Sequence, residues 1–193
     1  MTGPTAARVV ATLGTDHHLF DRLVGWLDAW AAETDAASVL VQYGHSAAPR
    51  VAEGVPMLPR EVLLTEIRDA RIVVTHGGTG SVMEARAAGH VPIVVPRTEA
   101  LSEHVDDHQV GFARRMAGLG WVHVAETESE LREHLGRALA DPSAYRLPGG
   151  GTPDIAAVPA VDALMADVLR RPPGTVSPRR VGQVLGYLRR RRS

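Results

Sequence analysis

The sequence contains neither cysteine nor lysine, and each absence restricts what the protein can be. Without cysteine there is no disulfide framework and no thiolate ligand for a metal. The lack of disulfides fits a reducing compartment, so a cytoplasmic location is expected. All 21 basic side chains are therefore arginines.

Long apolar segments are missing too. No uninterrupted apolar run approaches the ~20 residues that a membrane-spanning helix needs. Residues 1–8 lack the basic start and the apolar core of a signal peptide, so none is expected. With 193 residues, of which 45% are hydrophobic, we expect one compact domain with extensions.

Charge is distributed unevenly along the chain. All 22 acidic residues lie at or before Asp167, whereas eight of the 21 basic residues follow it. An acidic body is not expected to bind nucleic acid. The arginine-rich end could contact anionic lipid or an acidic partner, and a solvated run of charge is the competing interpretation.

Short apolar runs alternate with segments of helical spacing from residue 8 to about residue 140. The expected strands are residues 8–13, 38–43, 72–74, 91–96 and 121–124, with a short extended piece at 55–57. The expected helices are residues 18–33, capped by Asp16, and 60–69, 81–88, 102–118 and 128–140. This order predicts an α/β fold with a parallel sheet and helices on both faces, which is Rossmann-like.

The composition changes after Asp141. Proline and glycine are frequent in residues 142–159, which predicts a linker between a domain of residues 1–141 and a C-terminal extension. Residues 160–193 are predicted to form a helical, arginine-rich tail. Its last helix could dock on another molecule or pack on its own domain.

A glycine-rich turn, His76-Gly-Gly-Thr-Gly-Ser81, separates a predicted strand from a predicted helix. Glycines allow close approach of the backbone, and unpaired N–H groups at a helix start attract anions. We therefore interpret the turn as a diphosphate site. A tight turn whose glycines serve geometry alone is the alternative.

Polar side chains follow the other strands at the edge where ligands bind in parallel sheets. Glu84, early in the helix after the glycine turn, could accept two hydrogen bonds from a ribose. His108 and Gln109 follow the next strand, and glutamine offers one donor and one acceptor to a pair of sugar hydroxyls.

Taken together, these segments resemble a known family. The residues that carry the resemblance are His76 to Glu84, Ala88-Gly89, Pro92 to Pro96, His104, Asp106 and His108-Gln109, preceded by Gly14-Thr15 and by Val41 to His45. In this order the set resembles the C-terminal, donor-binding half of family 28 glycosyltransferases, over roughly residues 8–140. The opening segments are similar to single-domain relatives, namely exopolysaccharide subunits of the PssE and EpsF kind and the cytosolic subunit of the dolichol-linked N-acetylglucosaminyltransferase.

The resemblance implies the C-terminal half of a GT-B fold that binds a UDP-sugar as co-substrate, with no cofactor and no metal, and transfers the sugar with inversion. The residues it implies are Gly14, Thr15, His76, Gly77, Gly78, Thr79, Gly80 and Ser81 for the diphosphate, Glu84 for the ribose, Met57 and Leu58 for the uracil, and His108 and Gln109 for the sugar.

Transfer also needs a general base for the acceptor hydroxyl. In two-domain family members the base comes from the N-terminal half, so the resemblance implies a membrane-associated partner subunit that binds the acceptor, at the inner face of the membrane. His17 in the first loop departs from the family pattern. It is the one catalytic candidate of this chain, and a solvated loop histidine is the competing interpretation.

Two further alternatives stay open. His104 and His108 are four residues apart, which is metal-ligand spacing on a helix, and with Asp107 between them they could form a zinc site. Asp106 and Asp107 are interpreted as complementing a helix dipole rather than as a catalytic pair. At the level of function, a non-catalytic nucleotide-sugar-binding module that stabilises a partner enzyme competes with catalysis. A fragment of a GT-B epimerase or phosphorylase is a third possibility.

Overall fold

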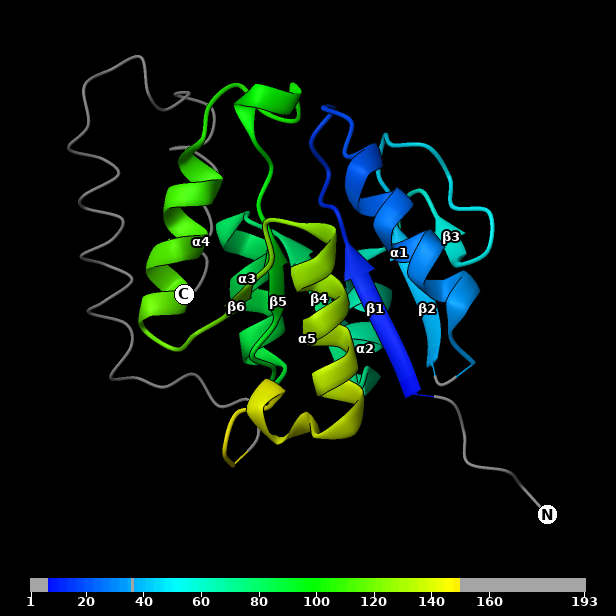
Figure 1. Ribbon diagram of the computed structural model, residues 1–193, viewed down its shortest axis with the longest axis vertical. Coiled ribbons are helices and arrows are strands. Elements are labelled where there is room, and N and C mark those ends of the chain that lie inside the picture. The colour runs from blue at the N-terminus through cyan, green and yellow to red at the C-terminus, as the bar shows by residue number, and fades with distance from the viewer. Residues whose placement is uncertain (1–6, 36, 150–193) are drawn as a thin grey trace. The chain divides into compact units, whose positions relative to one another are not determined.

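The computed structural model describes residues 7–35 and 37–149. They form a six-stranded sheet in the order β3-β2-β1-β4-β5-β6, in which every pairing is parallel (Figure 1). The strands are β1 Ala7–Thr12, β2 Ala37–Gln42, β3 Glu53–Val55, β4 Ile72–His76, β5 Ile93–Val95 and β6 His123–Val124. The helices are α1 Asp21–Glu33, α2 Arg60–Asp69, α3 Thr79–Ala87, α4 His108–Gly118 and α5 Glu128–Ala140, with 3-10 helices at Glu99–Leu101 (η1) and Pro142–Tyr145 (η2).

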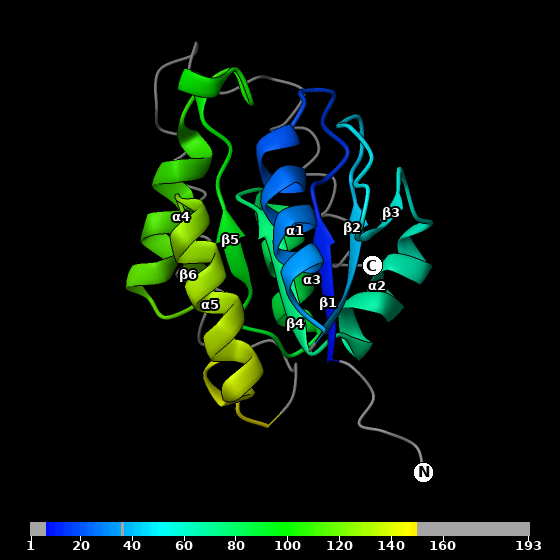
Figure 2. The same ribbon diagram turned by 45° about the vertical axis from the view of Figure 1, so that its right-hand side comes forward.

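The sheet grows outward from β1 on both sides: β2 and β3 follow on one side, and β4, β5 and β6 follow on the other. β1 pairs with β2 on one side and with β4 on the other, so Thr12 lies between Gln42 and Thr75. The loops that follow β1 and β4 consequently leave the sheet side by side, at the point where ligands bind in open parallel sheets. The loop after β5, which carries η1, leaves the sheet at the same end (Figures 1 and 2).

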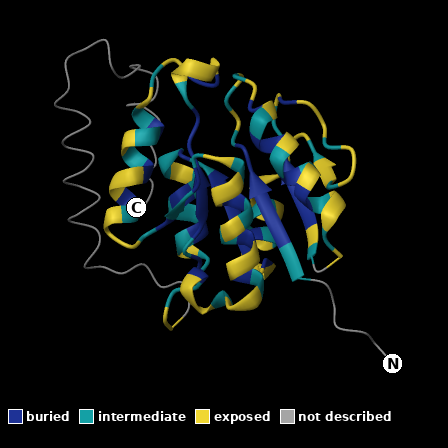
Figure 3. Ribbon diagram, in the orientation of Figure 1, coloured by how far each residue is buried: buried dark blue, intermediate teal, exposed yellow. Residues whose placement is uncertain are grey.

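Alternate residues of the strands supply two separate cores. Val9 and Ala11 belong to a cluster that includes Leu27 of α1 and Leu131 of α5. Val10 belongs to the other cluster, together with Ile67 of α2 and Ala85 of α3. Because successive side chains of a strand point to opposite faces, α1 and α5 cover one face of the sheet, and α2 and α3 cover the other (Figure 2). The central strands are accordingly buried along most of their length (Figure 3).

The predicted parallel sheet with helices on both faces is confirmed, and two helices, α2 and α5, match their predicted ranges. Gly89 has φ +89°, directly after the C-cap of α3, as a glycine that ends a helix should. One cap was not predicted. Thr127 and Glu130 form a capping box at the start of α5, in which each side chain binds the other's backbone N–H.

The first helix was predicted wrongly at its start. α1 begins at Asp21 rather than His18, and its N-cap is Phe20, not Asp16. The N–H of Phe20 donates to the hydroxyl of Ser46, in the loop after β2, at 2.8 Å. Asp16 instead accepts from the backbone N–H of His18 at 3.0 Å.

The helix predicted over residues 102–118 was also too long, because α4 begins at His108. Ser102 has φ +57°, which is incompatible with a continuing right-handed helix. Asp106 accepts from the N–H of His108, and Asp107 accepts from the N–H of Glu99. Short acidic side chains that capture nearby N–H groups favour turns over helix.

Two smaller corrections concern the edges of the domain. The extended piece expected at residues 55–57 is β3, Glu53–Val55, which pairs with β2. Residues 142–147, expected in a linker, instead belong to the domain, since Tyr145 of η2 is buried and the Leu147 N–H donates to the Gly89 carbonyl at 2.9 Å. The predicted helical tail, residues 160–193, lies outside the described residues.

Within residues 7–35 and 37–149, no helix combines the length and the apolar composition needed to cross a membrane.

Candidate functional site

The glycine-rich turn joins β4 to α3 at the carboxyl edge of the sheet. Gly78 is the N-cap of α3 with extended backbone (φ −76°, ψ 129°), and no side chain caps this helix start. The N–H groups in the first turn of a helix have no partner within the helix, and the helix dipole makes this end positive. The turn therefore presents backbone donors to an anion at the sheet edge.

His76 holds this turn in shape. Its Nδ1 accepts from the N–H of Gly78 at 3.0 Å, and its Nε2 lies 3.1 Å from the hydroxyl of Ser81. A neutral imidazole that accepts at Nδ1 carries its proton on Nε2, so Nε2 donates to the Ser81 oxygen. The Ser81 hydroxyl then has its own proton to donate to a ligand.

The glycines around His76 are required by its ring. A Cβ atom at Gly78 or at Gly14 would overlap the imidazole. Gly14 also has φ +77°, a conformation that other residues adopt at a cost. The loops after β1 and β4 thus meet at one ring.

Glu84 and the predicted uracil segment come together through an arginine. Arg60, the first residue of α2, contacts Oε1 of Glu84 through Nε at 3.1 Å and Nη2 at 3.0 Å. Met57 and Leu58 lie just before α2, and the Leu58 N–H donates to the side chain of Gln42 at 3.3 Å. Glu84 is therefore on the helix that the glycine turn leads into, and its ion pair reaches the first residue of α2, two residues after the segment expected to read the base.

Gln109 packs directly on the glycine turn. A Cβ atom at Gly77 would lie 2.8 Å from Cβ of Gln109. The Gln109 side chain is buried, and its Oε1 accepts from the N–H of Arg97 at 3.3 Å. Of the two groups that the sequence offered to a sugar, the acceptor is thus used within the fold. The neighbouring His108 is partly exposed at the start of α4.

Arg97, directly after β5, ties the loops of this edge together. Its guanidinium donates to the carbonyls of His18 at 2.7 Å, Leu13 at 3.0 Å and Glu103 at 3.2 Å. It is fully buried and stacks on the Phe20 ring, 4.7 Å from the centroid. One side chain therefore joins the loop after β1 to the loop after β5.

A second link between the same loops is an ion pair. Arg22 of α1 contacts both carboxylate oxygens of Glu103 at 2.8 Å, and its Nη2 donates to the Pro96 carbonyl at 3.0 Å. Sequence reasoning missed Arg22, Glu103 and Arg97. The available signal was an arginine at the end of a buried strand, a position at which a charge requires partners.

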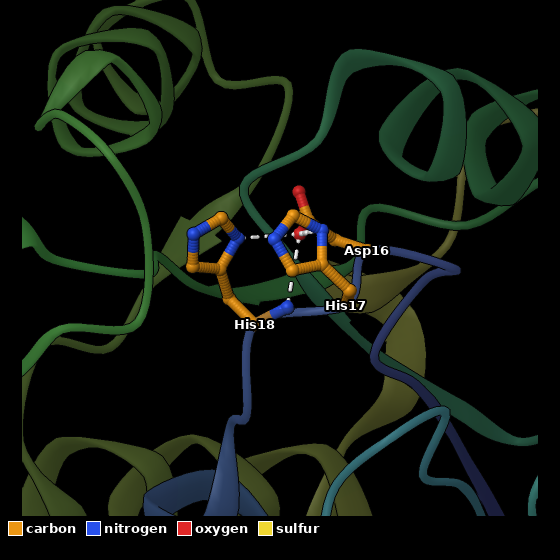
Figure 4. A group of neighbouring side chains, drawn as sticks. All are labelled: Asp16, His17 and His18. Carbon is orange, nitrogen blue, oxygen red and sulfur yellow. Dashed lines mark hydrogen bonds and ion pairs between the residues drawn. The ribbon is translucent and has the colours of Figure 1, made fainter.

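Histidines and aspartates gather between these loops. The Asp16 carboxylate is 2.6 Å from Nδ1 of His18 and 3.5 Å from Nδ1 of His17 (Figure 4). His17, the predicted catalytic candidate, has a side chain that is 80% exposed. It borders an open hollow of about 590 Å³ together with His18 and Leu101.

His104, predicted on a helix, instead lies in the irregular segment before α4. The rings of His104 and His108 nevertheless meet with centroids 4.6 Å apart. His45 contacts the Asp16 carbonyl through Nδ1 at 3.1 Å, so it belongs to the same edge. His90 does not: it is buried under α2, where Nε2 donates to the Ile67 carbonyl at 2.8 Å.

Comparisons with known proteins agree with this arrangement. The model of the glycosyltransferase family 28 C-terminal domain matches residues 29–147, which is more than half of the chain. A curated relative from Rhodospirillum rubrum is 36% identical over 116 residues, covering 55% of this chain and 29% of the relative. That relative is UDP-N-acetylglucosamine--N-acetylmuramyl-(pentapeptide) pyrophosphoryl-undecaprenol N-acetylglucosamine transferase. The chain thus spans less than a third of the relative's length.

Solved structures show the same fold. The crystal structure of MurG from Acinetobacter baumannii is similar with a TM-score of 0.52 and 17% identity, over 75% of this chain and 44% of MurG. The solution structure of ALG13 is similar with a TM-score of 0.53 and 16% identity, over 86% of this chain and 98% of ALG13. The Rossmann-like sheet is therefore that of one half of a GT-B glycosyltransferase. With a family model that matches most of the sheet and the whole glycine turn, the chain belongs to the glycosyltransferase family 28 C-terminal domain family.

Proposed function

We propose that this chain is the donor-binding subunit of a bipartite glycosyltransferase, which transfers a sugar from a UDP-sugar, with inversion and without a metal, to a lipid-linked or polysaccharide acceptor. The observation that carries the proposal is the uncapped start of α3, which lies against the loop after β1 and has Glu84 one turn further along the helix. Membership of the family supplies the reaction class.

The proposed roles follow the order of the groups along the edge. The turn from His76 to Ser81, with Gly14 and Thr15, binds the diphosphate through N–H groups and hydroxyls. Glu84 accepts from the ribose, and Met57 and Leu58 contact the uracil. Donors fixed in place at the leaving diphosphate stabilise the charge that develops there, which is the task a metal performs in other enzymes.

The acceptor side is proposed to come from a membrane-associated partner. The match to ALG13 covers 98% of that chain, which supports the idea that this fold can occur as a subunit without its other half. The partner would hold the acceptor and supply the base, at the inner face of the membrane. His17 is exposed at the open edge, where it would meet that partner, and remains the candidate base on this chain.

The ribose contact gives a sharp test of donor binding. Replacing Glu84 with Ala removes the proposed acceptor of the ribose hydroxyls, so UDP should bind about tenfold more weakly by calorimetry. Glu61→Ala, an exposed acidic position of α2, is the matched control and should bind UDP like the wild type. Equal affinity in all three proteins would remove Glu84 from the site.

Transfer is tested separately. The purified chain is mixed with a labelled UDP-sugar, with and without washed membranes of the source organism as the supply of partner and acceptor. Labelled lipid or polysaccharide should appear only in the combined sample, and not with Glu84→Ala. Transfer by the chain alone to a soluble acceptor at an undiminished rate would contradict the bipartite arrangement, and UDP binding without transfer would favour a non-catalytic module.

A further inference from the structure

His104 lies at the centre of the histidine and aspartate groups of the sheet edge. Its side chain is fully buried, and each ring nitrogen faces a carboxylate. Nδ1 is 3.4 Å from Oδ1 of Asp106, and Nε2 is 3.6 Å from Oδ2 of Asp16. Two carboxylates beside a buried neutral imidazole cost free energy unless a positive charge, on the ring or bound to it, compensates them.

His108 completes the group on the side of Asp106. Its Nδ1 contacts Oδ1 of Asp106, the oxygen that also faces His104. The possible ligand atoms of His104, Asp106 and His108 all lie within 4.8 Å of one another. Two imidazole nitrogens and one carboxylate oxygen thus converge on one point next to the start of α4.

We propose that His104, Asp106 and His108 bind a divalent transition-metal cation, with Zn²⁺ the best fit to two nitrogen ligands and one oxygen ligand. Three protein ligands leave the fourth position of a tetrahedral site to water or to a bound molecule. Asp16 lies behind His104, with its Oδ2 3.6 Å from Nε2, so its negative charge favours the tautomer that carries the proton on Nε2 and leaves Nδ1 for the cation.

One of the ligand separations already fits such a cation. Nitrogen and oxygen ligands lie at about 2.0–2.2 Å from Zn²⁺, so neighbouring ligand atoms of a tetrahedral site are about 3.3–3.5 Å apart. Nδ1 of His104 and Oδ1 of Asp106 are 3.4 Å apart. His108 and Asp106 are in direct contact, closer than two ligands of one cation, so His108 must move away from Asp106 when the cation takes the place of the proton between them.

The carboxylate of Asp106 is held in place by the backbone at the start of α4, because it accepts from the N–H of His108 at 3.1 Å.

A second group, Asp16, His17 and His18, offers a less favourable site. The side chain of His17 is 80% exposed, and His17 lies in the loop between β1 and α1. Asp16 already accepts from the backbone and the ring of His18. The burial of His104 therefore decides in favour of the group that contains it.

The test is a titration of the full chain, free of any histidine tag, with ZnCl₂ alone. Calorimetry should show about one bound equivalent. The melting temperature should rise by about 5 °C at a hundredfold excess of Zn²⁺ over Kd. In long-range ¹H–¹⁵N spectra of the wild type, the ring nitrogens of two histidines should shift to metal-bound values. No nucleotide is present, so the outcome is independent of donor binding.

Variants locate the site. Asp106→Asn and His104→Gln should each weaken Zn²⁺ binding at least about a hundredfold, whereas His45→Gln and His17→Gln should bind like the wild type. Loss of binding in His17→Gln with retention in Asp106→Asn would place the cation on the other group and overturn the proposal. Absence of Zn²⁺ binding in the wild type would also overturn the proposal. If a variant fails to fold, the ring-nitrogen spectra of the wild type still show whether two histidines bind the cation.

Discussion

At the scale of single residues, the buried polar side chains of this protein hold backbone in place. His90 is an example outside the candidate site, since its ring donates to the Ile67 carbonyl beneath α2. Burial, together with the nearby charge of Arg146, lowers the pKa of His90 to about 4. The imidazole is therefore neutral in the folded protein at pH values at which it is charged in the unfolded chain.

This difference predicts a loss of stability in mild acid. The contribution of neutral His90 is complete above the unfolded pKa near 6.5 and declines as the pH falls toward about 4. Between pH 7.5 and pH 4.5 the free energy of unfolding should fall by about 2.5 kcal/mol through this group. His90→Gln keeps a donor for the Ile67 carbonyl but does not titrate, so its urea midpoint should depend less on pH. An unchanged pH profile in His90→Gln would contradict this, and His45→Gln, on a surface loop, serves as the control.

At the scale of elements, the site is a set of loops whose shape depends on contacts between them. The turn after β4 is shaped by the ring of His76, and the loop after β1 passes close enough that only glycine fits at position 14. Loops held in this way are already ordered before a ligand arrives, which reduces the entropy lost on binding.

The glycine turn can be tested by adding one methyl group. A Cβ at Gly78 would overlap the His76 ring, so Gly78→Ala should displace the ring and weaken UDP binding by at least about tenfold. Gly25→Ala is the matched control, because Gly25 lies within α1 and a Cβ there meets open space. That variant should be slightly more stable and bind UDP normally. Equal UDP affinity in both variants would show that the turn tolerates a side chain.

Arg97 offers a test of the link between the loops. Arg97→Met fills similar volume but leaves the carbonyls of Leu13, His18 and Glu103 without this donor, so the free energy of unfolding should fall by about 3 kcal/mol. Arg114→Met, which breaks the exposed pair with Glu126, should leave the urea midpoint nearly unchanged. A midpoint for Arg97→Met close to that of the wild type would mean that water replaces the guanidinium.

At the scale of the whole molecule, the sheet is most secure at its centre. β1 and β4 have neighbours on both sides and helices over both faces, whereas β3 at one edge contains only three residues and is largely exposed. The candidate site rests on the ends of the central strands, so its loops are anchored on the most stable part of the fold.

Amide hydrogen exchange should reflect this difference in stability between the central strands and the edge strands. The amides of Val10 and Val74 should exchange only through global unfolding, whereas those of β3 and β6 should exchange through smaller openings and with less dependence on denaturant. Exchange followed by NMR at several urea concentrations gives the opening free energy of each amide. Opening free energies in β3 equal to those in β1 would contradict the proposed order.

The sequence alone was sufficient for the sheet, for most helices and for the position of the glycine turn at the ligand-binding edge of the sheet. Apolar runs, helical spacing and the glycines of residues 76–80 are local signals, because they reflect burial and backbone conformation within a few residues. The nearness of Glu84 to the glycine turn could be predicted for the same reason, because the turn leads directly into the helix that carries Glu84.

Only the tertiary structure decided how the loops of the edge are held. Arg97 donates to the carbonyl of His18, 79 residues away, and the Ser46 hydroxyl accepts from the N–H of Phe20, 26 residues before it. Nothing local signals such bonds. The meeting of His104, Asp106 and His108 was likewise a matter of loop geometry, because the spacing that suggested a metal site assumed a helix that does not extend to His104.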